Sequence, residues 1–262
     1  MFNIVAQARE VTERALLQGA LHSLSTEVEI INEWEFVFTL RMATNLRKKS
    51  AAKKQCGGRV NPFLPYETAL YVADLGKKHV CILNKYNVLP EHLLIITREF
   101  ESQQSALTRE DFAALMMIMA ESGGFGFFNG GEAAGASQPH KHLQWVPATQ
   151  EDFPLLNEPS LPFVHHDQRY LAGDAASCYQ AYLALRSQAG WQTGQPFNLL
   201  ITPGLMRWIP RNRAEVVNVS INSLGFAGSF FVSDKEQAVA LQATGLMNAL
   251  CQASGTREIN PD

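Results

Sequence analysis

The sequence predicts an α+β fold with a mostly antiparallel sheet and flanking helices. Short apolar runs typical of strands come in pairs, at 79–83 with 92–97 and at 197–202 with 206–210. The short connection within each pair favours antiparallel pairing, because parallel neighbours need a long crossover. Segments with helical features follow, so the second half repeats the hairpin-then-helix order of the first. The identity between the halves is too weak to establish a repeat from sequence alone.

The N-terminal region begins with a predicted helix and a strand or hairpin. Apolar residues recur at roughly helical spacing between Ile4 and Leu16, which indicates an amphipathic helix. Between Val28 and Leu40 the apolar residues occupy even positions, which is typical of a strand or hairpin with one buried face. Residues 44–66 are basic, contain glycines and prolines and show no periodicity, so they predict a long loop.

Capping residues predict the ends of the later helices. Thr108 with Asp111 forms a short version of a capping box, and Gly123-Gly124 would end that helix. Asp174 can cap a helix that reaches Gln188. The segment 233–236 is a capping box that would open a last helix reaching about residue 253.

The composition is that of a globular protein and excludes several classes. Of the 262 residues, 46% are apolar and 18% are charged, which argues against disorder. No run of about 18 apolar residues predicts a membrane span, and the N-terminus does not resemble a signal peptide. The four cysteines are widely spaced, so we expect a reducing, cytoplasmic setting without a disulfide framework.

The net charge of −3 hides a strongly basic stretch. Residues 41–59 contain seven basic side chains and no acidic one, which leaves 15 basic against 25 acidic residues elsewhere, a net charge of −10. Such a patch on an acidic body indicates an anionic partner. A solvated loop would show the same charge pattern, and that interpretation stays open.

The most informative segment lies in a strand predicted over 140–146, after a short strand over 125–129. Alternation along the strand places His140, His142 and Gln144 on one face. A neutral imidazole is a good nucleophile at phosphorus near neutral pH, and an amide can donate a hydrogen bond to a phosphate oxygen. The alternative is that these histidines are a polar strand face or satisfied core groups.

Small residues precede this strand, in the loop over 130–138. Gly130, Gly131, Gly135, Ala136 and Ser137 let backbone N–H groups approach phosphate oxygens closely. The other histidines, His79 and His165-His166, do not complete a tetrahedral set of metal ligands, so no metal site is predicted.

Together these residues resemble a known family. His-x-His-x-Gln resembles the histidine-triad superfamily, transferase branch. Within it, Asn129-Gly130-Gly131 and Ser137-Gln138-x-His140-Lys141-His142-Leu143-Gln144 are similar to the diadenosine tetraphosphate phosphorylase, or ATP adenylyltransferase, family. Shorter matches cover most of residues 50–235: Asn61-Pro62-Phe63, Leu83-Asn84-Lys85, Pro90-Glu91-His92, Thr97-Arg98-Glu99-Phe100, Asn198-Leu199-Leu200 and Pro210-Arg211.

The resemblance implies a histidine-triad-like sheet in a single nucleotidyltransferase unit over 1–262. About 1–150 would be the catalytic half and about 151–262 the second half. It implies that His142 attacks the α-phosphorus of diadenosine tetraphosphate and forms an adenylyl-histidine with release of ATP. Inorganic phosphate would then attack this intermediate and give ADP. Hydrolytic relatives have a third histidine where this chain has Gln144, which cannot act as a general acid or base.

The resemblance also implies roles for further residues. His140 would orient the nucleophile, Asn129 and the segment Gly135, Ala136, Ser137 and Gln138 would hold phosphate oxygens, and Lys54 would contact the polyphosphate. Leu83 and Asn84 would line the nucleotide site, with Asn84 at the ribose or base. Asn198, Met206 and Arg211 would also bind substrate. No tightly bound cofactor is expected; Mg²⁺ would be held by the nucleotide phosphates.

Three alternative functions fit the sequence less well. Hexose-1-phosphate uridylyltransferases share the branch, but they typically have proline and glycine where this chain has Lys141 and Leu143. A non-catalytic nucleotide sensor need not retain His142 and Gln144. A nucleic-acid binder fits poorly with the acidic remainder of the chain. We therefore expect small-molecule partners and neither nucleic acid nor membrane; the sequence leaves the oligomeric state open.

Overall fold

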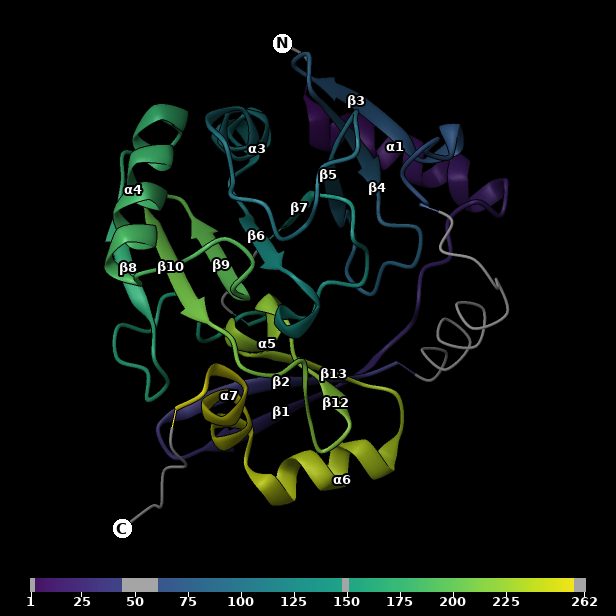
Figure 1. The fold of residues 1–262 in the computed structure, drawn as a ribbon. Helices are drawn as coiled ribbons and strands as arrows, with labels where there is room; N and C mark the ends of the chain where they lie inside the picture. Colours follow the sequence, from purple (N-terminus) through teal and green to yellow (C-terminus); the bar gives the residue numbers. More distant parts are fainter. Residues whose placement is uncertain (1–2, 44–60, 148–150, 257–262) are drawn as a thin grey trace.

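The structure, a computed structural model, describes residues 3–43, 61–147 and 151–256. Its centre is an eight-stranded sheet in which all neighbouring strands are antiparallel (Figure 1). In spatial order the strands are β3 (Tyr71–Leu75), β4 (His79–Leu83), β5 (Leu93–Thr97), β7 (His142–Val146), β6 (Phe125–Gly130), β9 (Phe197–Thr202), β10 (Leu205–Pro210) and β8 (His166–Arg169). The predicted α+β class with a large antiparallel sheet is confirmed.

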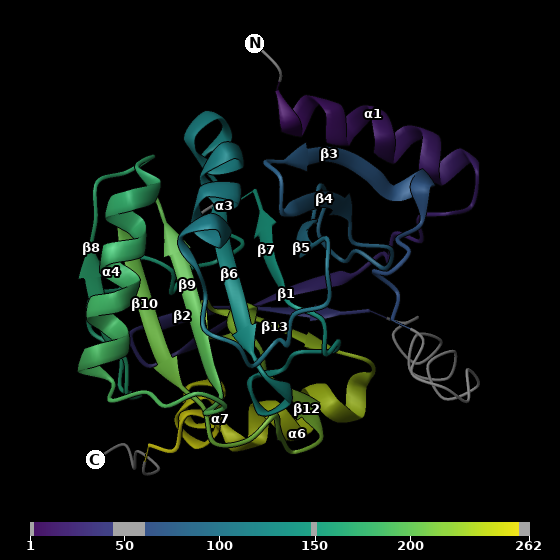
Figure 2. The ribbon, with the colours of Figure 1, turned by 45° about the horizontal axis from the view of Figure 1, so that its top comes forward.

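The two faces of this sheet are covered differently, as Figures 1 and 2 show. One face packs against α1 (Ile4–Leu17), α3 (Arg109–Ser122) and α4 (Ala175–Gln188), with one large apolar core between them. Below the other face lie a three-stranded sheet and the C-terminal helices, around a second core. These elements are β1 (Glu27–Glu33), β2 (Phe36–Met42), β13 (Ser229–Val232), α5 (Ser223–Phe226), α6 (Lys235–Thr244) and α7 (Leu246–Ser254). Short elements complete the fold: η1 (Thr68–Leu70), η2 (Glu132–Ala134), β11 (Glu215–Val216) and β12 (Val219–Ser220).

Two units with the same element order meet at the middle of the large sheet. In the first, β5 leads through α3 to the hairpin β6–β7, and β7 pairs with both β5 and β6. In the second, β8 leads through α4 to the hairpin β9–β10, and β10 pairs with both β8 and β9. The units join where β6 pairs with β9. The repeated order is therefore strand, helix, hairpin. The hairpin-then-helix order expected from sequence is present in the first half, where α3 follows the hairpin β4–β5. In the second half, β11 and β12 follow the hairpin β9–β10 before the next helix, α5.

Local capping chemistry determines where several helices begin. Thr108 caps α3 through the backbone N–H of Asp111, whose carboxylate accepts from the Thr108 N–H, so the predicted capping box is present. Asp174 caps α4 as predicted. The last helix differs: Asp234, not Ser233, caps α6, and Gly245 at φ +84° separates α6 from α7.

The N-terminal hairpin also departs from the expected pattern. Residues 27–42 do form the hairpin β1–β2, but Val28 and Ile30 are about half exposed, whereas Phe36, Phe38 and Leu40 are buried. The expected single buried face is therefore correct for β2 and wrong for β1, which is an edge strand. Within the described part of the chain, no helix is both long and apolar enough to cross a membrane.

Candidate functional site

The polar side chains singled out in the sequence gather on one face of the large sheet. Their chain neighbours Phe128, Leu143, Trp145 and Leu199 belong to the helix-side core. Because side chains alternate along a strand, Asn129, His142, Gln144 and Asn198 point to the opposite face. They come from three adjacent strands, β6, β7 and β9.

The hydrogen bonds of His142 leave its Nε2 atom available as a nucleophile. The Nδ1 atom lies 2.8 Å from the backbone oxygen of His140. A carbonyl oxygen can only accept, so Nδ1 carries the proton and Nε2 keeps its lone pair. No described residue forms a hydrogen bond with Nε2. Burial lowers the pKa of His142 to about 4, although the bond to the His140 carbonyl opposes this shift, so the ring is neutral at pH 7.

Both ring nitrogens of His140, in contrast, are already occupied. The Nε2 atom lies 2.9 Å from the Thr97 backbone oxygen and therefore donates, and Nδ1 accepts from the side-chain amide of Asn61 at 2.9 Å. Burial lowers the pKa of His140, against the effect of the Thr97 bond. The edge-on ring of Phe63 packs against His140 and His142, with centroid distances of 5.5 and 5.3 Å. Both ring nitrogens of His140 are thus bonded within the protein in this geometry.

A chain of hydrogen bonds fixes the side-chain amide of Gln144. The Oε1 atom of Gln144 accepts from Nε2 of His92 at 2.9 Å, and Nδ1 of His92 accepts from the amide of Asn84 at 3.2 Å. His92 and Gln144 are both buried. Because its oxygen is held by His92, Gln144 presents its NH₂ group as the donor. Asn84 is thus linked to Gln144 through His92.

A second chain fixes the side chain of Asn129. Its Oδ1 atom accepts from Asn198 Nδ2 at 2.8 Å and from the N–H and hydroxyl groups of Ser223 at 3.0 and 2.7 Å. The oxygen of Asn198 in turn accepts from the guanidinium of Arg211. The NH₂ group of Asn129 has no acceptor among the described residues, so it is the donor that can reach a substrate oxygen.

Arg211 supports this arrangement from inside the protein. Its remaining N–H groups donate to the backbone oxygens of Ala134, Arg213, Ile221 and Ala253. Burial lowers the pKa of Arg211 to about 9. With every donor bonded within the protein, the guanidinium holds Asn198 and the loop at Ala134 and offers no free N–H group to a phosphate. The direct substrate contact that the resemblance implies for Arg211 stays a prediction.

The small-residue loop forms a closed turn around η2. Gly131 and Gly135 have φ +101° and +86°, and a Cβ at Gly135 would lie 2.7 Å from that of Asn222. The N–H groups of Gly135 and Ala136 donate to the oxygens of Glu132 and Gly131. In this geometry these two N–H groups are occupied and not offered to a phosphate.

Other predicted site residues lie elsewhere. Leu83 and Met206 are buried in the helix-side core, so the structure does not bring their side chains to the face of His142. Lys54 lies outside the described residues. Conversely, sequence reasoning assigned no role to His92, Gln103 or Ser223, which contact Gln144, His142 and Asn129. In the described segments, no cluster of three His, Cys, Asp or Glu side chains could hold a metal.

Comparisons with known proteins agree with this geometry. Residues 2–163 match the family model of the Ap4A phosphorylase N-terminal domain, and residues 159–255 match that of the ATP adenylyltransferase C-terminal domain. The chain belongs to the Ap4A phosphorylase and ATP adenylyltransferase family. It is therefore a nucleotidyltransferase.

Individual relatives of this Ap4A phosphorylase family member come from yeast. Diadenosine 5′,5‴-P1,P4-tetraphosphate phosphorylase 2 of Saccharomyces cerevisiae is 26% identical over 255 residues, which cover 76% of this chain and 77% of the yeast protein. The crystal structure of yeast Ap4A phosphorylase Apa2 with Ap4A matches with a TM-score of 0.81 at 24% identity, covering 97% of this chain and 98% of that one. The same yeast protein with AMP gives a TM-score of 0.82 at 23% identity, with 98% and 99% coverage. The folds are therefore alike.

Proposed function

We propose that this protein splits diadenosine tetraphosphate, and similar dinucleoside polyphosphates, with inorganic phosphate to give ATP and ADP. The observation that carries the proposal is the lone pair of His142 Nε2 on the same sheet face as two fixed amide donors, Gln144 and Asn129. The yeast relative named as a tetraphosphate phosphorylase supports the choice of substrate.

In the first step, Nε2 of His142 attacks the α-phosphorus of one adenylate. A P–N bond forms, the bond from this phosphorus to the bridging oxygen breaks, and ATP leaves with that oxygen's electron pair. The imidazole becomes cationic, and its Nδ1–H bond to the His140 carbonyl, 2.8 Å long, stabilises this charge. The NH₂ groups of Gln144 and Asn129 donate to the phosphoryl oxygens as negative charge develops there.

In the second step, an oxygen of inorganic phosphate attacks the same phosphorus. The P–N bond breaks, its electron pair returns to Nε2, and ADP is released. Gln144 has no ionisable group, so this position supplies no base that could activate water. Phosphate is already anionic and needs no such base. Mg²⁺ enters as part of the nucleotide substrate, bound by its phosphates.

The covalent step can be tested by trapping. Mixing the enzyme with radiolabelled Ap4A in the absence of phosphate should give one equivalent of ATP and an acid-labile adenylyl adduct on the protein. His142→Ala should form no adduct. The matched control is His165→Ala, at a histidine next to β8, the edge strand that β6, β9 and β10 separate from β7; it should label like the wild type. Labelling of the His142→Ala variant would show that another residue is the nucleophile.

A further inference from the structure

The strands β6 and β7 separate where the nucleophile begins. They pair at Phe125 with Val146, Gly126 with Trp145 and Phe127 with Gln144. Continuing this register would place Asn129 opposite His142, yet these two residues do not pair. On its other side, β7 remains paired with β5 as far as Ile96 and His142. The sheet thus opens on one side at the nucleophile.

The side chain of Gln103 fills this opening. Its Oε1 atom accepts from the backbone N–H of His142 at 2.8 Å, and its Nε2 atom donates to the backbone oxygens of His142 at 3.2 Å and Asn129 at 2.9 Å. Gln103 is only 2% exposed. A side-chain amide therefore takes the place of the missing ladder and bridges the two strands that carry the nucleophile and a phosphate donor.

The backbone of Gln103 is held beside the nucleophile as well. Its N–H group donates to the oxygen of Pro139 at 2.8 Å, and the preceding residue, Ser102, pairs with His140. The bond between His142 Nδ1 and the His140 oxygen, which sets the tautomer, lies between these two attachment points. Gln103 thus binds both ends of the segment 139–142, which orients the imidazole of His142.

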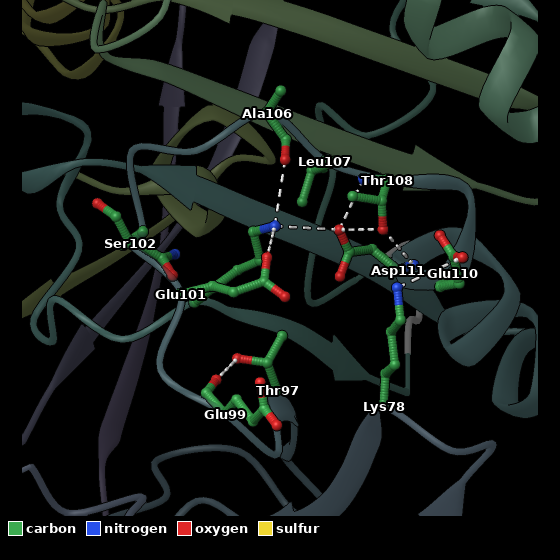
Figure 3. Close-up of polar contacts among 12 residues, drawn as sticks. Lys78, Thr97, Glu99, Glu101, Ser102, Ala106, Leu107, Thr108, Glu110 and Asp111 are labelled. Atoms are coloured by element: carbon green, nitrogen blue, oxygen red, sulfur yellow. Dashed lines mark hydrogen bonds and ion pairs between the residues drawn. The ribbon is translucent and has the colours of Figure 1, made fainter.

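A buried lysine anchors the segment that carries Gln103. The ammonium of Lys141, which is 1% exposed, donates to the carboxylate of Glu101 at 2.5 Å, the backbone oxygen of Ala106 at 3.2 Å and the carboxylate of Asp111 at 3.4 Å. Figure 3 shows these three groups converging, two from the segment and Asp111 from α3. The segment is therefore attached on both sides of Gln103.

We propose that Gln103 is a positioning residue for the nucleotidyl transfer. Its side-chain amide lies between the backbones of His142 and Asn129 and sets the distance between them. This distance leaves space for a phosphoryl group between the His142 imidazole and the Asn129 NH₂ group. Gln103 also preserves the tautomer with a free Nε2. This role rests on the function proposed above, and Gln103 itself does not touch the reacting atoms.

The test replaces the amide by a side chain of similar length without donors or acceptors, Gln103→Met. The matched control is Gln104→Met, at the exposed neighbouring position. In rapid-quench experiments without phosphate, Gln103→Met should form the adenylyl adduct about 100-fold more slowly, the effect of a misplacement of roughly 1 Å. Its Kd for Ap4A should change less than about threefold, because the donors on substrate oxygens remain.

A second readout separates positioning from stability. The ¹⁵N shifts of the His142 ring report which nitrogen carries the proton; Gln103→Met should show a mixture of tautomers, and Gln104→Met only the Nδ1–H form. Adduct formation within threefold of the wild type, or an unchanged tautomer with a slower rate, would overturn the role of Gln103. If the wild type forms no adduct, the proposed function fails. The ¹⁵N shifts of the His142 ring then still test whether Gln103 positions this side chain.

Discussion

Burial of His142 makes the folded protein less stable in acid, and His142→Asn should remove this effect. In the unfolded chain, His142 takes up a proton near its ordinary pKa of 6.5, whereas in the folded protein burial lowers this pKa to about 4. Between these two values only the unfolded state binds the proton. Lowering the pH through this window therefore favours unfolding, and the effect is absent above pH 6.5.

The magnitude follows from the two pKa values. Each unit of pH between them shifts the free energy of unfolding by about 1.4 kcal/mol, so the drop from pH 7.5 to pH 5 should amount to about 2 kcal/mol from this histidine. His142→Asn removes the titrating group and leaves the other ionisable residues in place. On going from pH 7.5 to pH 5, the variant should therefore gain about 2 kcal/mol in the free energy of unfolding relative to the wild type.

Urea unfolding of both proteins at pH 7.5 and pH 5 measures this difference directly. Comparing variant and wild type at each pH cancels the contribution of the other titrating groups, provided that the m-values agree. Equal pH dependence in the two proteins would refute the claim that burial keeps His142 neutral. If the wild type instead becomes more stable relative to the variant at pH 5, the folded protein stabilises the charged imidazole.

Two further substitutions test the hydrogen bond to Gln144 and the basic stretch. His92→Phe removes the group that holds the Gln144 oxygen, so kcat/KM for Ap4A should fall about tenfold, as for one lost hydrogen bond to a charged transition state; an unchanged value would show that Gln144 does not need His92. Lys54→Ala removes one charge from the basic stretch and should raise KM and weaken its salt dependence without moving the urea midpoint; an unchanged KM would assign that stretch to a solvated loop.

Sequence reasoning succeeded where the deciding interactions are local. The caps at Thr108 and Asp174 were predictable because each side chain bonds to backbone three residues away. The same holds for the common face of His142 and Gln144, since alternation is a property of the strand itself.

It failed where a partner distant in sequence decides the outcome. The break at Gly245 is stabilised by the Glu33 carboxylate on β1, which accepts from the N–H groups of Leu246 and Met247. Nothing near residue 245 reveals that contact. The amide of Gln103 carries no local signal either, because its role comes from a gap between two strands of another part of the chain. Val28 and Ile30 of β1 follow the strand period, yet both stay about half exposed, whereas Ile31 on the other face of the strand packs against the second core.

The central claim is that the adenylyl group passes from His142 to phosphate and not to water. The most direct measurement follows the nucleotides released from Ap4A by the wild-type protein with and without inorganic phosphate. Continuous formation of ATP and ADP only when phosphate is present, with a single equivalent of ATP per protein when it is absent, is the predicted result. Continuous formation of ATP and AMP without phosphate would contradict it.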